Sequence, residues 1–98
     1  MGTFQRTETV DARQFTGGLE NGTNLALWVN SQGQLTETRA EYHDAIKIGS
    51  RTLGERVRIR TYNWRESAFV GDWVILKQDG SFAHMSDQEF LEAGYSQV

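Results

Sequence analysis

Alternation of apolar and polar residues is clearest at residues 56–62, RVRIRTY. Val57, Ile59 and Thr61 fall on one face of an extended strand, and the intervening arginines fall on the other, because strand side chains alternate. Residues 67–78 follow and contain the uninterrupted apolar run WVIL. Such a run indicates a central strand that is buried on both faces.

Three further strand-like segments lie in the first half of the chain. Residues 7–15, TETVDARQF, alternate as expected for an early, partly exposed strand. Residues 35–49 contain the runs LTETRAEY and AIKIG, which both favour strands. The polar pair His43-Asp44 lies between these runs and predicts a turn.

The segment between these strands has the period of a helix. Its apolar residues lie at i, i+3 and i+4, and they are Leu25, Trp28 and Val29. We expect a short helix over about residues 23–31. Asn21 or Thr23 is the expected N-terminal cap, and Gly33 is expected to end the helix.

The stretch GDWVILKQDGSFAHMSDQEF near the C-terminus is dense in turn and cap signals. Asp79-Gly80 predicts a two-residue type I′ hairpin turn, which requires a positive φ at both central positions. Ser86 and Glu89 have the spacing of a capping box, in which each residue bonds the backbone of the other. A second helix should therefore start here, and Gly94 should stop it after about two turns.

Together these elements predict an α+β fold in a single domain over residues 1–98. We expect an antiparallel sheet of five or six strands with two short helices packed on one face. The helices at 25–29 and 86–93 would bury Trp28 and Phe90 against that face. The opposite face would carry the arginines.

Composition and charge narrow the class of protein. The 98 residues include no cysteine, which excludes disulfides, thiol catalysis and thiolate metal sites and fits a reducing cytoplasm. No segment has the length of a membrane span, so we expect no membrane partner.

Net charge is −3, yet residues 47–65 carry six basic groups against one acidic group. A basic centre between acidic flanks indicates either internal charge matching or a binding face.

The residues with catalytic potential form no recognisable site. His43 and His84 are far apart in sequence and match no metal-ligand spacing, and the neighbouring Glu41 and Asp44 are interpreted as a surface cluster. The sequence contains no nucleophile elbow, phosphate loop or dinucleotide fingerprint. We therefore predict that the protein is not an enzyme and holds no cofactor and no metal.

The strongest candidate for function is an arginine ladder on one strand face. Arg56, Arg58 and Arg60 lie at i, i+2 and i+4, about 7 Å apart. They could hold a nucleic acid or another phosphate-bearing ligand, with aromatic residues stacking on bases. They could instead pair with Glu37, Glu41 or acids of the last third of the chain on a solvated face, and this is the interpretation that we favour. The overall acidity argues against an extended nucleic-acid groove. The candidate partner-binding residues are Arg56, Arg58, Arg60, Tyr62, Trp64 and Arg65.

The sequence is compatible with two roles for Trp64. A tryptophan at the tip of a hairpin over residues 62–66 could anchor an interface, because tryptophan and arginine dominate such contacts. The tip could equally fold over its own sheet and bury the ring. Edge strands of a small sheet also invite pairing across a two-fold axis, so a homodimer is a further alternative.

Several segments resemble a widespread group of small, mostly uncharacterised proteins of tailed bacteriophages and prophages. The matching segments are VDARQF, LALWV, VRIRT and GDWVILKQDGSF, together with Phe90 and Tyr95. They cover both ends of the chain and skip about residues 32–55. The chain departs from the group at Val70, where a proline is common, at Trp64, and in the Phe90-to-Tyr95 spacing. The resemblance implies a viral origin and expression in the host bacterial cytoplasm, and it implies no catalytic residues.

These observations give two functional hypotheses. The first is a non-enzymatic phage accessory protein that binds a host or phage protein through the candidate residues. The alternative is a nucleic-acid or nucleotide-binding module that uses the Arg56/Arg58/Arg60 strand face, with binding that weakens steeply as salt rises.

Overall fold

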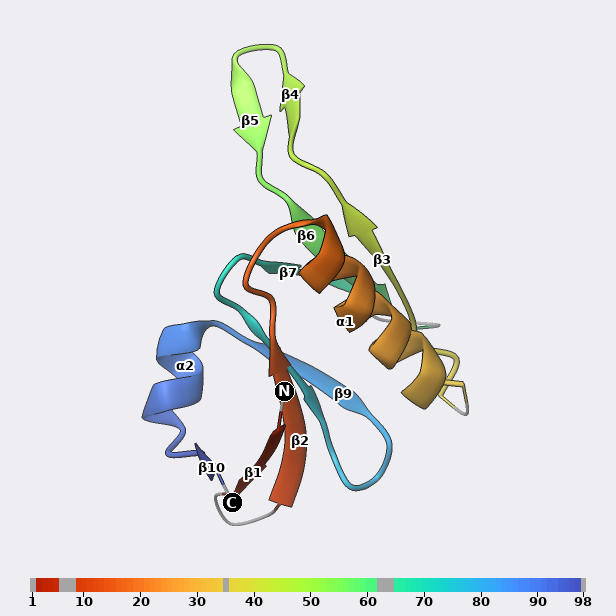
Figure 1. The fold of residues 1–98 in the computed structure, drawn as a ribbon, viewed down its shortest axis with the longest axis vertical. Coiled ribbons are helices and arrows are strands. Elements are labelled where there is room, and N and C mark those ends of the chain that lie inside the picture. The colour runs from red at the N-terminus through yellow and green to blue at the C-terminus, as the bar shows by residue number, and fades with distance from the viewer. Residues whose placement is uncertain (1, 6–8, 35, 62–64, 98) are drawn as a thin grey trace.

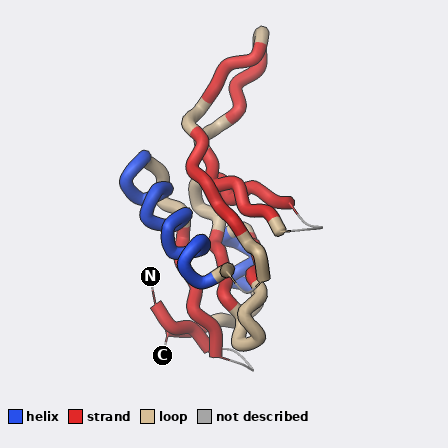
Figure 2. The backbone as a smooth tube through the Cα atoms, turned by 90° about the vertical axis from the view of Figure 1, so that its right-hand side faces the viewer, coloured by secondary structure: helices blue, strands red, loops and turns tan. Residues whose placement is uncertain are grey.

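The structure of the chain is a computed structural model that describes residues 2–5, 9–34, 36–61 and 65–97. These residues form two helices and ten strands, arranged in three antiparallel sheets (Figures 1 and 2). In chain order the elements are β1 (Gly2–Gln5), β2 (Thr9–Gln14), α1 (Leu19–Gln32), β3 (Arg39–His43), β4 (Ile46–Ile48), β5 (Arg51–Leu53), β6 (Arg56–Arg60), β7 (Arg65–Phe69), β8 (Trp73–Leu76), β9 (Phe82–Met85), α2 (Asp87–Glu92) and β10 (Ser96–Gln97). The predicted combination of antiparallel strands with two helices is confirmed.

The largest sheet has five strands in the order β10-β1-β2-β8-β9. Val74 and Ile75 of β8 are both buried although they point to opposite faces, which confirms the central strand predicted from the WVIL run. On one face Val74 packs into an apolar cluster with Trp28 of α1. On the other face Ile75 packs into a second cluster with Phe90 of α2.

The prediction of one sheet with both helices on the same face is wrong. The two helices cover opposite faces of the five-stranded sheet, each in its own apolar cluster. The segment predicted as one strand over 67–78 is broken at Gly71, and its two halves belong to different sheets. This glycine has a φ of 97°, so β7 ends before it and β8 begins after it in a different sheet. A glycine inside a strand pattern is a common site of a bulge or a bend.

A second sheet has three strands in the order β3-β6-β7, and α1 packs against it. Its inner face consists of small and aliphatic side chains that join the cluster around Leu25 and Val29 of α1. These inner residues are Ala40, Val57, Ile59 and Ala68. The alternate residues of the same strands point away from α1 and form the candidate site described below.

The ladder of β3 and β6 leads into a two-stranded hairpin of β4 and β5, residues 46–53, which we call the arm (Figure 1). The arm extends the molecule along its longest axis, to 45 Å against 29 and 24 Å for the other two axes. The predicted turn at His43-Asp44 is wrong, because the chain continues from β3 into β4 and reverses at Gly49. Gly49 has a φ of 62°, the positive φ that tight hairpin turns require.

Hydrogen bonds at the base of the arm connect it to the first helix. The Tyr42 hydroxyl donates to Glu55 over 2.6 Å, and this bond raises the pKa of Tyr42. The Gly18 N–H donates to the same carboxylate over 3.2 Å. Glu55 therefore places a negative charge at the N-terminus of α1, where the helix dipole favours it. This contact spans 37 residues of sequence, and it helps to explain why α1 begins at Leu19, earlier than predicted.

The two predicted caps of α1 are also wrong. Gly18 is the N-cap residue and makes no side-chain cap, while the Asn21 side chain accepts a hydrogen bond from the Thr16 N–H. The predicted end of the helix is confirmed, because Gly33 is the C-cap.

The C-terminal turn and helix follow the local signals in the sequence closely. Among Asp79 and Gly80 only the glycine has a positive φ, so the hairpin has a three-residue loop rather than the predicted type I′ turn. The capping box is confirmed: Ser86 Oγ accepts from the Glu89 N–H and Glu89 Oε1 accepts from the Ser86 N–H. Gly94 follows the helix with a φ of 80°, as predicted for its stop.

Candidate binding face

The candidate site is the outward face of the three-stranded sheet. The strand register sets its side chains in three rows across β3, β6 and β7. The rows are Arg39–Arg60–Arg65, Glu41–Arg58–Ser67 and His43–Arg56–Phe69. We call the five arginines of these rows the arginine face: Arg39, Arg56, Arg58, Arg60 and Arg65.

The strand geometry fixes the spacing of the arginine face. Neighbouring rows are about 7 Å apart along the strands, and neighbouring arginines within a row are about 5 Å apart between strands at the backbone. Arg39, Arg60 and Arg65 are exposed, and Arg56 and Arg58 are half-buried. Alternation in the sequence predicts that the three arginines of β6 share a face, and the strand register places them so.

None of these five arginines forms an ion pair with any residue in the described part of the chain. Glu41 is directly opposite Arg58 in the register, but its Oε1 lies 3.3 Å from His43 Nε2 instead. Glu37 makes no ion pair there with an arginine either. The predicted pairing of the arginines with internal carboxylates is therefore absent among the described residues. Arg39 and Arg56 each donate a hydrogen bond to a backbone carbonyl, of Thr38 and Gly54 respectively.

The row Arg39–Arg60–Arg65 lowers the stability of the fold when no partner is bound, because like charges directly opposite on neighbouring strands repel. The charge is also concentrated: residues 39–65 hold seven of the ten basic residues of the chain and three of its thirteen acidic residues. A fold gains nothing from gathering like charges on one sheet face. An anionic partner would relieve this repulsion on binding.

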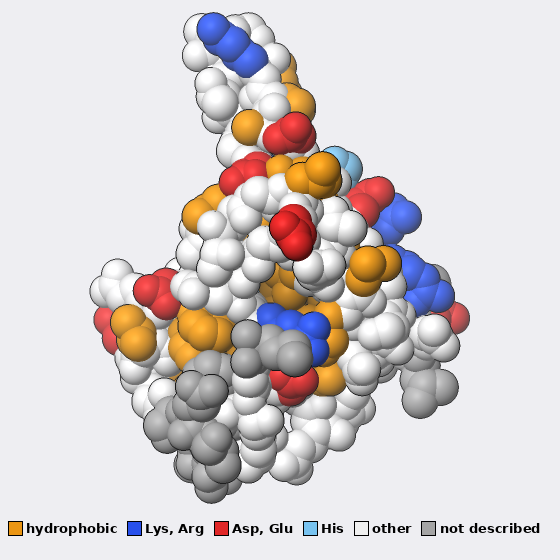
Figure 3. Space-filling view, viewed as in Figure 1, with side chains coloured by type: hydrophobic (Ala, Val, Ile, Leu, Met, Phe, Trp, Pro, Cys, Tyr) orange, Lys and Arg blue, Asp and Glu red, His pale blue; other side chains and the backbone are white. Residues whose placement is uncertain are grey.

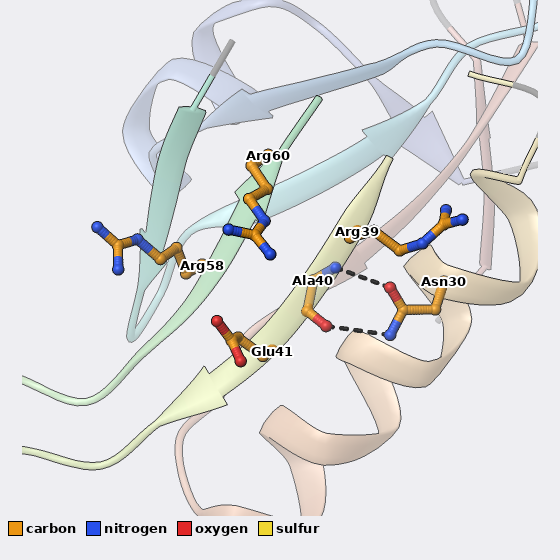
Figure 4. Close-up of a pocket in the computed structure, with 6 residues that line it drawn as sticks. All are labelled: Asn30, Arg39, Ala40, Glu41, Arg58 and Arg60. Atoms are coloured by element: carbon orange, nitrogen blue, oxygen red, sulfur yellow. Dashed lines mark hydrogen bonds between the residues drawn. The ribbon is translucent and has the colours of Figure 1, made fainter. Parts of the chain in front are cut away.

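A hollow of about 340 Å³ lies beside the arginine face, between β3, β6 and the last turns of α1. Its lining side chains come from these three elements: Arg39 and Glu41 from β3, Arg58 and Arg60 from β6, and Asn30 from α1 (Figure 4). Asn30 donates to the Ala40 carbonyl over 3.0 Å and accepts from the Ala40 N–H over 2.7 Å. It thereby pairs the free edge of β3 as a neighbouring strand would, which leaves this edge closed to strand addition at Ala40.

The predicted site residues divide into two groups. Arg56, Arg58, Arg60 and Arg65 come together on one face, whereas Tyr62 and Trp64 lie outside the described residues. Arg39 was missed by the sequence reasoning. The alternation of Arg39 with Glu41 and His43 predicts which strand face it lies on, but not which residues lie next to it. Only the pairing of β3 with β6 brings Arg39 beside Arg60.

A second polar cluster, also missed, joins the two larger sheets. His84 of β9 lies between two carboxylates: its Nδ1 is 2.8 Å from Glu66 Oε2 of β7, and its Nε2 is 2.9 Å from Asp72 Oδ2. Only the doubly protonated ring can donate at both nitrogens. Asp72 Oδ2 also accepts from the Phe69 N–H over 2.9 Å. The three side chains therefore form a hydrogen-bonded bridge between β9 and the segment around β7.

Neither cluster has the donor set of a metal centre, since the described residues contain no group of three or more His, Asp or Glu side chains placed to hold an ion. No helix in the described ranges combines the length and the apolar character that crossing a bilayer demands.

Comparisons with protein-family models, with curated proteins and with solved structures gave no match to this chain.

Proposed function

We propose that this chain is a non-enzymatic bacteriophage accessory protein that acts in the host bacterial cytoplasm by binding a host or phage protein. The arginine face is the contact surface, and the partner presents a complementary acidic patch. One observation carries the proposal: five arginines share an outward sheet face, and none of them pairs with a carboxylate within the described chain.

A protein with a local acidic patch fits this face better than a long polyanion does. The chain has a net charge of −3, and the regions on both sides of the basic centre are acidic. An extended polyanion would meet these acidic regions and be repelled, whereas an acidic patch of limited size would meet only the arginines. Phe69 lies on the same face beside Arg56 and is exposed, which supplies an apolar contact of the kind found in protein interfaces.

The test is affinity capture from a bacterial host lysate with the wild-type protein and with the Arg58→Glu/Arg60→Glu variant. We expect the wild type to retain a specific protein and the variant to lose it, with affinity lowered about 100-fold or more, because two attractive charges become repulsive. Lys77→Glu is the matched control: this exposed lysine follows β8, outside the face, and its reversal should leave capture unchanged. Equal capture by all three proteins would show that the arginine face is not the contact surface.

A nucleic acid is the second candidate partner, and the row spacing of the arginine face is the observation that favours it. Guanidinium groups repeated about every 7 Å can follow successive phosphates of a single strand. Fluorescence polarisation with a labelled single-stranded oligonucleotide at low salt tests this directly. Binding that falls steeply with salt and is lost in Arg58→Glu/Arg60→Glu would support the nucleic acid, and no binding at low salt would remove it.

A further inference from the structure

The arm is a concentration of uncovered apolar side chains. Ile46, Ile48 and Leu53 are three of the eight large hydrophobic residues that are exposed in the described chain, and Ile48 is 61% exposed. Every residue of both strands of the arm is exposed. A two-stranded hairpin alone is at best marginally stable in water, so apolar side chains spread along one indicate a surface that a partner covers.

The apolar residues share one side of the arm with a single charge. Ile46 pairs with Leu53, and Ile48 pairs with Arg51, so these four side chains project from the same side. Lys47 projects from the other side. A hollow of about 210 Å³ lies against Ile48, Arg51, Thr52 and Leu53. It suits an apolar side chain that has a carboxylate next to it.

The second helix of this same chain carries that combination. Leu91 of α2 is 68% exposed, and the neighbouring Glu92 is exposed too. The helix has the sequence DQEFLE, with three acidic residues and no basic one. Two other exposed leucines outside the arm, Leu19 and Leu27, lie on α1. Leu19 also has a glutamate next to it, Glu20, but this is the one acidic residue among the fourteen of α1, whereas α2 has three in six.

The arm of one molecule points away from its own α2. Figure 1 shows the arm projecting from one end of the body and α2 packed against the side of the five-stranded sheet. Figure 3 shows hydrophobic and basic side chains on the projecting arm, with no other part of the chain covering them in that view. Contact between the two complementary surfaces therefore needs two copies.

We propose that the arm docks on α2 of a second copy of this chain, with Leu91 entering the hollow of the arm and Glu92 facing Arg51. The contact joins unlike surfaces, so it can close reciprocally between two copies or repeat from copy to copy. Eight arm residues and two helical turns make a small interface, and association is accordingly weak and concentration-dependent. The contact leaves the arginine face free, so it is independent of the function proposed above.

The test is sedimentation velocity of the full chain from about 5 to about 500 µM at low salt. We expect the wild type to associate over this range, and Leu91→Asp, Arg51→Glu and Glu92→Lys each to weaken association about tenfold or more, because each removes the apolar contact or the charge pair. Mixing Arg51→Glu with Glu92→Lys should restore association, since the reversed charges are complementary between the two proteins.

Arg60→Glu is the matched control, because it reverses an exposed arginine on the arginine face and should associate as the wild type does. A wild type that stays monomeric at about 500 µM would overturn the proposal. A mixture that fails to associate, or an Arg60→Glu variant as weak as Arg51→Glu, would also overturn it. Binding to the acidic protein partner or to an oligonucleotide is measured separately and depends on Arg58 and Arg60, so failure of one proposal leaves the other standing.

Discussion

Gly22→Ala is expected to lower the free energy of unfolding by about 2–4 kcal/mol, although alanine is the better helix former. Gly22 is buried in α1 against the ring of Tyr42. A Cβ at this position would lie 2.2 Å from Tyr42 Cδ1 and 2.8 Å from Tyr42 Cε1. The clash outweighs the gain of about 1 kcal/mol in helix propensity.

The Tyr42 ring cannot easily move away from the added methyl group. Its hydroxyl is bonded to Glu55, and its ring packs edge-on against Phe15 with the centroids 6.2 Å apart. Relief of the clash therefore requires α1 to shift from the three-stranded sheet, which disturbs the apolar cluster beneath it.

Chemical denaturation of Gly22→Ala and of the exposed control Asn24→Ala measures this effect. The control should change stability by less than about 0.5 kcal/mol. In a double-mutant cycle, Tyr42→Leu should recover part of the loss caused by Gly22→Ala, because the smaller side chain makes room. A Gly22→Ala protein more stable than the wild type would contradict the close contact between α1 and β3.

His84→Leu is expected to lower the free energy of unfolding by about 2–3 kcal/mol. The substitution removes the imidazole ring that is hydrogen-bonded between Glu66 and Asp72 and leaves two carboxylates facing an apolar side chain. His84 is 21% exposed and Asp72 is 18% exposed, so solvent only partly compensates the loss. The more exposed Glu66 reduces the expected effect below that of a fully buried pair.

His43→Leu is the matched control for this substitution. His43 has one carboxylate neighbour, Glu41, whose side chain is 62% exposed, and exposed pairs of this kind contribute little. We expect a change of less than about 1 kcal/mol there. Adding Asp72→Asn to His84→Leu should recover part of the loss, because it removes the repulsion between the carboxylates. Equal effects of the two histidine substitutions in thermal unfolding would show that the bridge does not hold the sheets together.

The sequence predicts best where structure is set by residues close together in the chain. The capping box of Ser86 and Glu89 and the stop at Gly94 depend on contacts within a few residues, and all of them are present. The apolar run of β8 likewise predicts burial on both faces of the strand, because no polar residue interrupts it, and Val74 and Ile75 are both buried.

The sequence predicts poorly where structure is set by contacts between distant residues. The placement of β7 and β8 in different sheets depends on the break at Gly71, whose φ is positive, and a glycine in a strand pattern is equally consistent with a bulge within one sheet. The early start of α1 involves Glu55, which is 37 residues away from Gly18. The placement of Arg39 beside Arg60 needs the register of β3 on β6, which no local pattern specifies.

The same limit applies to the candidate site. The alternation of RVRIRTY predicts that three arginines share a face, but the sequence favours their pairing with carboxylates such as Glu37 or Glu41 over a binding role. Only the side-chain positions separate the two cases. Glu41 contacts His43, and the five arginines form no ion pair among the described residues. The absence of these ion pairs is thus visible only in the three-dimensional arrangement and not in the composition.

The central claim is that the arginine face serves an external partner and not the fold. The most direct measurement is the free energy of unfolding of Arg60→Gln at low salt, without any partner. Arg60 lies between Arg39 and Arg65 in the register, so removing its charge relieves repulsion, and the account predicts stability equal to the wild type or higher by up to about 1 kcal/mol. A loss of about 1 kcal/mol or more would mean that Arg60 is paired within the protein, and it would contradict the account.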